Sequence, residues 1–328
     1  MFSERVSTYI KDTVEDKINL EYIALYKKLY KVDFKEDLKS YDRLRVNGIG
    51  EGLVDISPLK PLSNIFGNRV LLKVTNACFA HCRYCFRRDD IGENDAKISF
   101  SELDDAYKSI AINSEIKEVV VSGGEPFTLT DEKIFYIVEN LFKLENIRRI
   151  RFDTSIFTHN PNRISQKLVD KLTTIKNHYK KQIIIVGHFT HSAEITPSLI
   201  RAVEKFSNNG IMVRSHTPLL KGVNNKEGVL VELFGMLVDI GVHPYYLIHY
   251  IAHERTKHFE LSLSEGLKLY DEILHKCTGI EIPSYILYLK EGRGKKRLLS
   301  HNIIDNNDGT YEVLDKNGEK YIHKDFDI

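Results

Sequence analysis

Residues 76–88 read Asn76-Ala77-Cys78-Phe79-Ala80-His81-Cys82-Arg83-Tyr84-Cys85-Phe86-Arg87-Arg88 and contain three of the four cysteines of the chain. The cysteine spacing is C-x3-C-x2-C, and the fourth cysteine, Cys277, lies far away in the sequence. Three thiolates on one short loop can bind three irons of a 4Fe-4S cluster, which leaves the fourth iron without a protein ligand. Because such an iron can bind a small molecule, the spacing predicts a catalytic metal cluster.

Other interpretations of the cysteines fit the spacing less well. A structural zinc site needs four ligands, usually from two paired spacings, and His81, between Ala80 and Cys82, could hardly point the same way as both neighbours. A disulfide framework needs more cysteines and a secreted chain. An iron–sulfur electron carrier would use the same thiolates, but it would have no need of an open iron.

The composition of the whole chain indicates a globular protein with a full core. The 328 residues are 42% apolar, and 47 basic residues against 46 acidic ones give no sign of nucleic-acid binding. The first residues lead into a charged helical pattern rather than a signal peptide. No apolar run approaches the roughly 18 residues of a membrane span. We therefore expect a cytoplasmic protein without a membrane partner.

Hydrophobic periodicity predicts an α/β fold. Residues 1–60 predict a helical N-terminal extension, and six β-rich runs then alternate with helical patterns, which implies a parallel sheet with right-handed crossovers. The expected strands are Val70–Thr75, Glu118–Ser122, Arg149–Asp153, Gln182–His188, Ile211–His216 and Pro244–His249, and the expected helices lie near 101–114, 131–144, 162–176, 197–208, 226–240 and 264–276. Six such units suit a partial (βα)6 TIM-like barrel over residues 61–279. Residues 280–328 predict a small C-terminal β-rich segment with a further strand, a basic loop and a hairpin.

A second motif, Ser122-Gly123-Gly124-Glu125-Pro126, ends the second predicted strand. Two glycines let a ligand approach the backbone closely, and Glu125 offers an acceptor for an ammonium group. Alone, the motif is typical of an ordinary strand-to-loop turn. Like the cysteine loop, the motif follows a predicted strand, and active sites of α/β barrels gather at the C-terminal ends of the strands.

Further motifs follow one another along the chain between about residue 40 and the C-terminus. They are Arg69–Thr75, the cysteines with Phe86-Arg87-Arg88, Gly187–Thr196, Leu219–Asn224, Pro244-Tyr245-Tyr246, His258-Phe259, Ile282–Tyr285 and Gly292-Arg293-Gly294-Lys295. In these motifs the chain resembles the lysine 2,3-aminomutase family of the radical SAM superfamily. The resemblance implies a barrel of the radical SAM type. It also implies three cofactors: a 4Fe-4S cluster, S-adenosyl-L-methionine and pyridoxal 5'-phosphate.

The resemblance implies the reaction as well. The reduced cluster cleaves S-adenosyl-L-methionine to a 5′-deoxyadenosyl radical, and the amino group of a pyridoxal-bound amino acid moves from Cα to Cβ. The cofactors supply the difficult chemistry, while the protein positions them and excludes water. The implied partners are a small amino acid substrate and an electron donor such as flavodoxin or ferredoxin. The sequence does not determine whether the protein forms a homo-oligomer.

The family motifs assign roles to matching residues of this chain. Lys295 matches the lysine that carries pyridoxal phosphate, with Lys296 as the substitute if the loop is shifted by one residue. Arg87 matches the arginine that binds the substrate carboxylate, and Arg69 matches a contact to the cofactor phosphate. The resemblance implies contacts to S-adenosyl-L-methionine from Ser122, Gly123, Gly124 and Glu125. It implies that the cluster ligands are Cys78, Cys82 and Cys85. Three histidines are expected to line the pocket: His188, His191 and His216. Each assignment has an alternative. The histidines are equally compatible with a structural role. Lys295 would alternatively lie in a solvated basic turn, and each arginine would alternatively form a surface salt bridge.

The chain departs from the family where the substrate side chain is recognised. The family aspartates that hold the far ammonium of lysine match Ile251 and Tyr288 here, and a buried ammonium without a carboxylate is costly. We therefore expect a substrate with a neutral or smaller side chain, unless Glu254 or Glu291 supplies a substitute carboxylate.

Two more departures affect the cofactor phosphate and assembly. A family arginine four residues before Arg69 is Ile65 here, so phosphate binding would be weaker or would come from Arg88 or Lys73. The C-terminal zinc cysteines of the family are missing, which puts its larger assemblies in doubt. We expect Cys277 to be a buried small apolar residue.

Three enzymatic functions stay open on the sequence. The first is a free amino acid 2,3-aminomutase, and the second is a lysine 2,3-aminomutase acting for elongation factor P modification. The third is a radical SAM enzyme of another reaction that has lost pyridoxal phosphate. Pyridoxal content separates the first two from the third.

Overall fold

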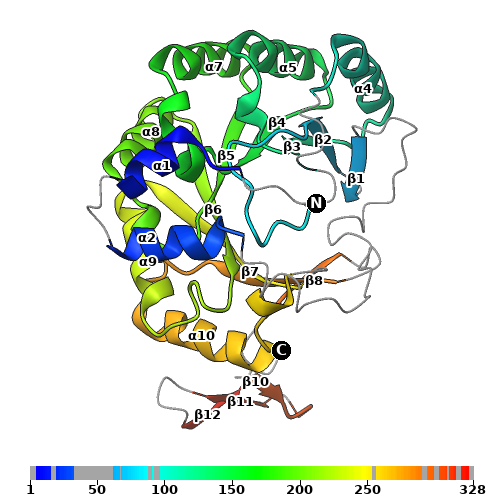
Figure 1. The fold of residues 1–328 in the computed structure, drawn as a ribbon. Coiled ribbons are helices and arrows are strands. Elements are labelled where there is room, and N and C mark those ends of the chain that lie inside the picture. The colour runs from blue at the N-terminus through cyan, green and yellow to red at the C-terminus, as the bar shows by residue number, and fades with distance from the viewer. Residues whose placement is uncertain are drawn as a thin grey trace.

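The computed structural model describes residues 5–15, 20–32, 62–66, 68–87, 91, 97–252, 256–289, 294–298, 303–308, 310–314 and 319–324. These residues form two N-terminal helices, a large sheet that curves into a partial barrel with helices on its outer face, and a small separate sheet (Figure 1). None of the described helices is both long and apolar enough to cross a membrane.

The barrel sheet has nine strands whose spatial order follows the sequence. The strands are β1 (Leu62–Phe66), β2 (Arg69–Thr75), β3 (Glu118–Gly123), β4 (Arg149–Thr154), β5 (Gln182–His188), β6 (Met212–Leu219), β7 (Val242–His249), β8 (Ser284–Tyr288) and β9 (Lys295–Arg297). Strands β2 to β8 run parallel, and β1 and β9 pair antiparallel at the two edges. All six strands expected from periodicity are present; Gln182–His188 has the expected bounds, and the other five have shifted ends.

Helices cross over between the parallel strands. They are α4 (Phe100–Ile112), α5 (Asp131–Lys143), α6 (Ile156–His159), α7 (Gln166–Tyr179), α8 (Pro197–Ser207), α9 (Val229–Asp239) and α10 (Leu263–Lys276). Five of them begin directly after a Ser or Thr whose side-chain oxygen accepts a backbone N–H of the first turn, which fixes the start of the helix: Ser99, Thr130, Ser165, Thr196 and Ser262. All six expected helices are found.

Side-chain alternation along the strands separates the core from the cavity. In β3, Val119 and Val121 are buried in the core between sheet and helices, whereas Val120 and Ser122 face the inside of the barrel. The same alternation applies to β4, where Ile150 and Phe152 pack outward and the polar residues between them point inward. The polar side chains of these strands therefore lie on the inner wall of the barrel, around the cavity.

The segment after residue 280 contributes to the barrel sheet. Strand β8 pairs in parallel with β7, from Ser284 opposite Tyr246, because α10 serves as one more crossover. Strand β9 then folds back onto β8 and brings Lys295 opposite Tyr288. The separate sheet consists only of β10 (Ile303–Asp305), β11 (Thr310–Leu314) and β12 (Lys320–Lys324), beyond α10 in Figure 1.

The N-terminal helices α1 (Thr8–Glu15) and α2 (Leu20–Leu29) cover one end of the barrel. Their buried residues, including Ile10 and Leu25, form a second hydrophobic cluster with Tyr84, Leu220 and Phe259. This cluster joins the N-terminal helices to the cysteine loop and to loops that follow the barrel strands.

Candidate active site

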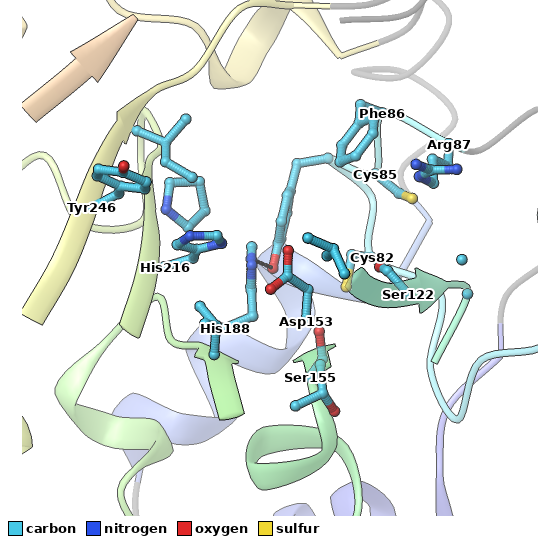
Figure 2. Close-up of a pocket in the computed structure, with 18 of the residues that line it drawn as sticks. Cys82, Cys85, Phe86, Arg87, Ser122, Asp153, Ser155, His188, His216 and Tyr246 are labelled. Atoms are coloured by element: carbon cyan, nitrogen blue, oxygen red, sulfur yellow. Dashed lines mark hydrogen bonds between the residues drawn. The ribbon is translucent and has the colours of Figure 1, made fainter. Parts of the chain in front are cut away.

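One cavity of about 360 Å³ lies inside the barrel at the C-terminal ends of the strands. Most of the residues that the sequence assigned to a cofactor, metal or substrate line it: Arg69, Cys78, Cys82, Cys85, Arg87, Ser122, Gly123, Gly124, Glu125, His188, His216, Ile251, Tyr288 and Lys295. In Figure 2, Cys82, Cys85, Phe86 and Arg87 lie on one side of this cavity, and His216 and Tyr246 lie on the other.

The cysteine loop follows β2 and brings the thiols of Cys78, Cys82 and Cys85 to the cavity. The pKa of Cys78 and that of Cys82 are raised, first by burial and next by the nearby Cys85. Within the described residues, no group of three or more histidine, cysteine or acidic side chains is arranged to hold a single metal ion. Thiolates of a zinc site converge at about 2.3 Å from one ion, whereas those of a cluster each bind a different iron. Three thiolates that each bind a different iron would leave the fourth iron of a 4Fe-4S cluster without a protein ligand.

The N-terminal helices hold the cysteine loop from outside. Arg83, 2% exposed, donates from its guanidinium to the carbonyl of Lys28 at 2.9 Å, and its backbone N–H donates to the carbonyl of Leu29 at 2.8 Å. The backbone N–H of His81 donates to the carbonyl of Arg5 at 2.9 Å. The N-terminal segment thus helps to shape the loop, a role that no local sequence pattern predicted.

The glycine turn packs against the start of the cysteine loop. Gly124 N–H donates to Thr75 O at 2.6 Å, and Glu125 N–H donates to Ala77 O at 2.7 Å. A Cβ on Gly123, whose φ is +126°, would lie 2.2 Å from Thr75 O, and one on Gly124 would lie 2.3 Å from Ala77 O. Only glycines allow this approach, so the second motif positions the first.

Glu125, which the sequence predicts to be an acceptor for an ammonium group, follows the glycine turn after β3. Its carboxylate is buried and accepts from Thr154 Oγ1 at 2.6 Å, from Ser155 N at 2.7 Å and from Phe127 N at 3.1 Å. Burial raises the pKa of Glu125 to about 7, although these hydrogen bonds oppose the rise. Glu125 lines the cavity, and its hydrogen bonds tie the glycine turn to the end of β4.

Lys295 enters the cavity from β9. Its Nζ donates to the hydroxyl of Tyr246 at 2.6 Å and lies 4.1 Å from the centroid of that ring. The pKa of Lys295 is lowered to about 8, first by burial and then by the guanidinium groups of Arg69 and Arg151. The adjacent Lys296 is exposed and does not line the cavity, as strand alternation requires. The geometry therefore favours Lys295 over its substitute.

A charged group on three neighbouring strands forms the wall near Lys295. Glu118 Oε1 lies 3.8 Å from Arg69 Nη1 and 3.5 Å from Arg151 Nη1, and Asp153 Oδ1 lies 2.8 Å from Arg151 Nε. The sequence analysis overlooked Arg151 and Asp153. The signal was present, because Arg149-Ile150-Arg151-Phe152-Asp153 alternates charged and apolar residues in a barrel strand whose inner face is usually apolar.

His188 and His216 lie side by side on β5 and β6. His188 Nε2 is 3.1 Å from the Tyr84 hydroxyl, and burial lowers the pKa of His188 to about 4. His216 stacks on the rings of Tyr245 and Tyr246, and its pKa is lowered well below the usual value, first by burial and then by Arg151. Both imidazoles are therefore neutral at physiological pH.

The expectation that His191 lines the cavity was wrong. Its Nδ1 accepts from the backbone N–H of Ala193 at 3.1 Å and so caps the short helix η3 (Ser192–Glu194). Lys73 does not line the cavity either, so it is no substitute contact for a phosphate there. Cys277 is half-buried at the end of α10 and packs against the core.

Some of the remaining candidate residues line the cavity, and others lie outside the described residues. Arg87 lines the cavity, with its Cζ 5.3 Å from the centroid of the Phe86 ring. Ile251 and Tyr288 also line it, and burial raises the pKa of Tyr288 to about 12, so its hydroxyl stays neutral. The substitutes Arg88, Glu254 and Glu291 and the side chain of Ile65 lie outside the described residues.

Comparison with known proteins agrees with this arrangement. The radical SAM superfamily model matches residues 72–234. A putative L-lysine 2,3-aminomutase of Aquifex aeolicus is 32% identical over 80% of this chain and 70% of its own length. A glutamate 2,3-aminomutase of Clostridioides difficile is 32% identical over 76% and 58%, and an L-lysine 2,3-aminomutase of Methanococcus maripaludis is 30% identical over 90% and 64%.

The last two matches leave more than a third of each relative uncovered. The family model nevertheless covers the cysteine loop and the barrel strands β3 to β6. The chain belongs to the lysine 2,3-aminomutase family of the radical SAM superfamily.

Proposed function

We propose that this protein is a radical SAM, pyridoxal-phosphate-dependent 2,3-aminomutase that moves an amino group from Cα to Cβ of an amino acid. The observation that carries the proposal is that Lys295 and the three-cysteine loop line the same cavity. When bound, the reduced cluster with S-adenosyl-L-methionine supplies a carbon radical, and pyridoxal phosphate carries the migrating amino group. The residues of the chain hold these groups and exclude water.

On the cluster side, Cys78, Cys82 and Cys85 hold the irons. The turn at Gly123 and Gly124 packs its backbone against the start of the cysteine loop without a side chain between them, which would suit contacts to the methionine moiety of S-adenosyl-L-methionine. Ser122 and Glu125 complete this wall of the cavity.

On the pyridoxal side, Lys295 attaches the cofactor. Attachment requires a neutral amine, and the lowered pKa of Lys295 supplies a useful fraction of it near neutral pH. The phosphate dianion would suit the guanidinium groups of Arg69 and Arg151, and the stacked His216 and Tyr246 offer flat surfaces beside Lys295. Arg87 binds the substrate carboxylate, for which a guanidinium fork is well suited.

The substrate side chain is neutral or small rather than the ammonium of lysine. Ile251 and Tyr288, at the positions where the family binds lysine, offer an alkyl group and a phenol that stays un-ionised. A glutamate 2,3-aminomutase among the relatives agrees with a family whose members differ in substrate. The electron donor is a flavodoxin or ferredoxin, and the protein acts in the cytoplasm.

Borohydride reduction of the anaerobically purified, pyridoxal-supplemented protein, followed by peptide mass mapping, tests the proposal. We expect a phosphopyridoxyl adduct on Lys295, its loss in Lys295→Ala, and its retention in Lys296→Ala. If Lys295 is unmodified while the cluster is intact and S-adenosyl-L-methionine is still cleaved, the protein is a radical enzyme of another reaction.

A further inference from the structure

His159, at the end of α6, lies next to one of the cluster cysteines. Its Nε2 is 3.6 Å from Cys82 Sγ, a distance that suits a hydrogen bond to the large sulfur atom. The side chain is 3% exposed and lines the same cavity as the cysteine loop. None of the roles proposed above uses this histidine.

The N-terminal helices fix the position of this ring. Tyr30, which directly follows α2, meets the imidazole edge-on with ring centroids 5.6 Å apart. The hydroxyl of Ser7, just before α1, donates to the backbone carbonyl of His159. The cover that holds the cysteine loop therefore also holds the imidazole beside Cys82.

The surroundings of the two ring nitrogens decide where the proton lies. Nδ1 is buried and has no hydrogen-bond partner among the described residues. A proton on Nδ1 would lack an acceptor there, whereas a proton on Nε2 points to a thiolate, which is a charged acceptor. A further polar group near Cys82 is the Tyr84 hydroxyl, which hydrogen-bonds to Cys82 and lies 3.1 Å from His188 Nε2.

We propose that His159 donates a hydrogen bond from Nε2 to the Cys82 thiolate and thereby raises the reduction potential of the cluster. This inference rests on the cluster-binding role proposed for the cysteine loop. Hydrogen bonds to the sulfurs are one of the means by which proteins set cluster potentials. The reduced cluster carries one more negative charge than the oxidised one, so the donor stabilises the reduced form more. His159 is a positioning and tuning residue in this account, since it acts through Cys82.

Redox titration of the reconstituted protein, followed by electron paramagnetic resonance, tests this inference. His159→Phe keeps an aromatic ring against Tyr30 but removes the donor, and His159→Gln keeps an N–H donor. In His159→Phe, with iron and sulfide contents equal to wild type, we expect the equilibrium constant for reduction to fall about tenfold, which is about 59 mV for one electron. His159→Gln should titrate close to wild type. A fully loaded His159→Phe protein with the wild-type potential would overturn the inference.

A second measurement uses the wild-type protein, so it does not depend on the folding of a His159 variant. The reduced wild-type protein, labelled with ¹⁵N-histidine, should show a histidine nitrogen coupling in pulsed electron paramagnetic resonance. The coupling should persist in His81→Gln, which removes the histidine that lies on the cysteine loop itself. Absence of any such coupling from the loaded wild-type protein contradicts the inference, whereas a wild-type protein that binds no cluster contradicts the proposed function itself.

Discussion

The pH dependence of pyridoxal attachment is the most quantitative prediction for Lys295. An ordinary lysine with a pKa of about 10.4 has fewer than about one amine in a thousand neutral at pH 7, whereas a pKa of about 8 leaves roughly a tenth neutral. Burial contributes most to this lowering, and Arg69 and Arg151 add to it. The neutral amine is the reactive form, so the initial rate of attachment should rise about tenfold per pH unit and level off above about 8.

The assay mixes apoprotein with pyridoxal phosphate anaerobically at a series of pH values, stops the reaction early with borohydride, and measures the adduct on Lys295 by mass spectrometry. Exposed lysines labelled in the same samples correct for the pH dependence of the reagent itself. Lys296→Ala should give the wild-type profile, because Lys296 lies outside the cavity. If labelling of Lys295 rises without a break to about pH 10, like a lysine in water, the electrostatic argument for this site is wrong.

Three further perturbations follow from the site. Cys82→Ala should remove nearly all cluster iron and its visible absorbance, whereas Cys277→Ala should keep both, because Cys277 packs against the core. Burial raises the pKa of Glu125 from 4.5 to about 7, so its contribution to stability is full below pH 4.5 and is lost as pH rises through 7. In urea unfolding at a series of pH values, Glu125→Gln should therefore reduce the fall in the free energy of unfolding between these pH values. The same fall in the variant as in wild type would contradict the raised pKa of Glu125. Ile251→Asp should raise kcat/KM for lysine by at least about tenfold, since a hydrogen bond to a charged group contributes about 1.5–3 kcal/mol; no gain would mean that position 251 does not face the substrate side chain.

Periodicity and motif order were enough to predict the barrel and most of its site. The strands alternate with amphipathic helices at regular spacing, and parallel strands place their C-terminal ends at one edge of a sheet. For this reason the cysteine loop after β2, the glycine turn after β3 and His188 at the end of β5 meet in one cavity. Lys295 needed the family motif, because a basic turn between glycines is usually solvent-exposed.

Other features depend on contacts between distant segments that no local pattern encodes. The packing of Tyr30 on His159, and the bond from Arg83 to the carbonyl of Lys28, join residues that are far apart in the sequence. The orientation of Arg151 and Asp153 follows from the register of β4 in the barrel, which becomes visible only when the inner face is known. His191 follows a strand end as expected, yet it caps a turn, because its ring nitrogen finds a backbone N–H close by.

The most direct test of the proposed function is turnover. The reconstituted protein, with S-adenosyl-L-methionine, pyridoxal phosphate and a reductant, is incubated anaerobically with a panel of neutral α-amino acids, glutamate and lysine, and the products are separated by chiral chromatography with mass detection. We predict a β-amino acid isomer from a neutral substrate, formed faster than β-lysine and absent in Lys295→Ala. Turnover of free lysine ahead of every neutral amino acid would contradict the proposed substrate class. Cleavage of S-adenosyl-L-methionine without a β-amino acid from any member of the panel would contradict the aminomutase account.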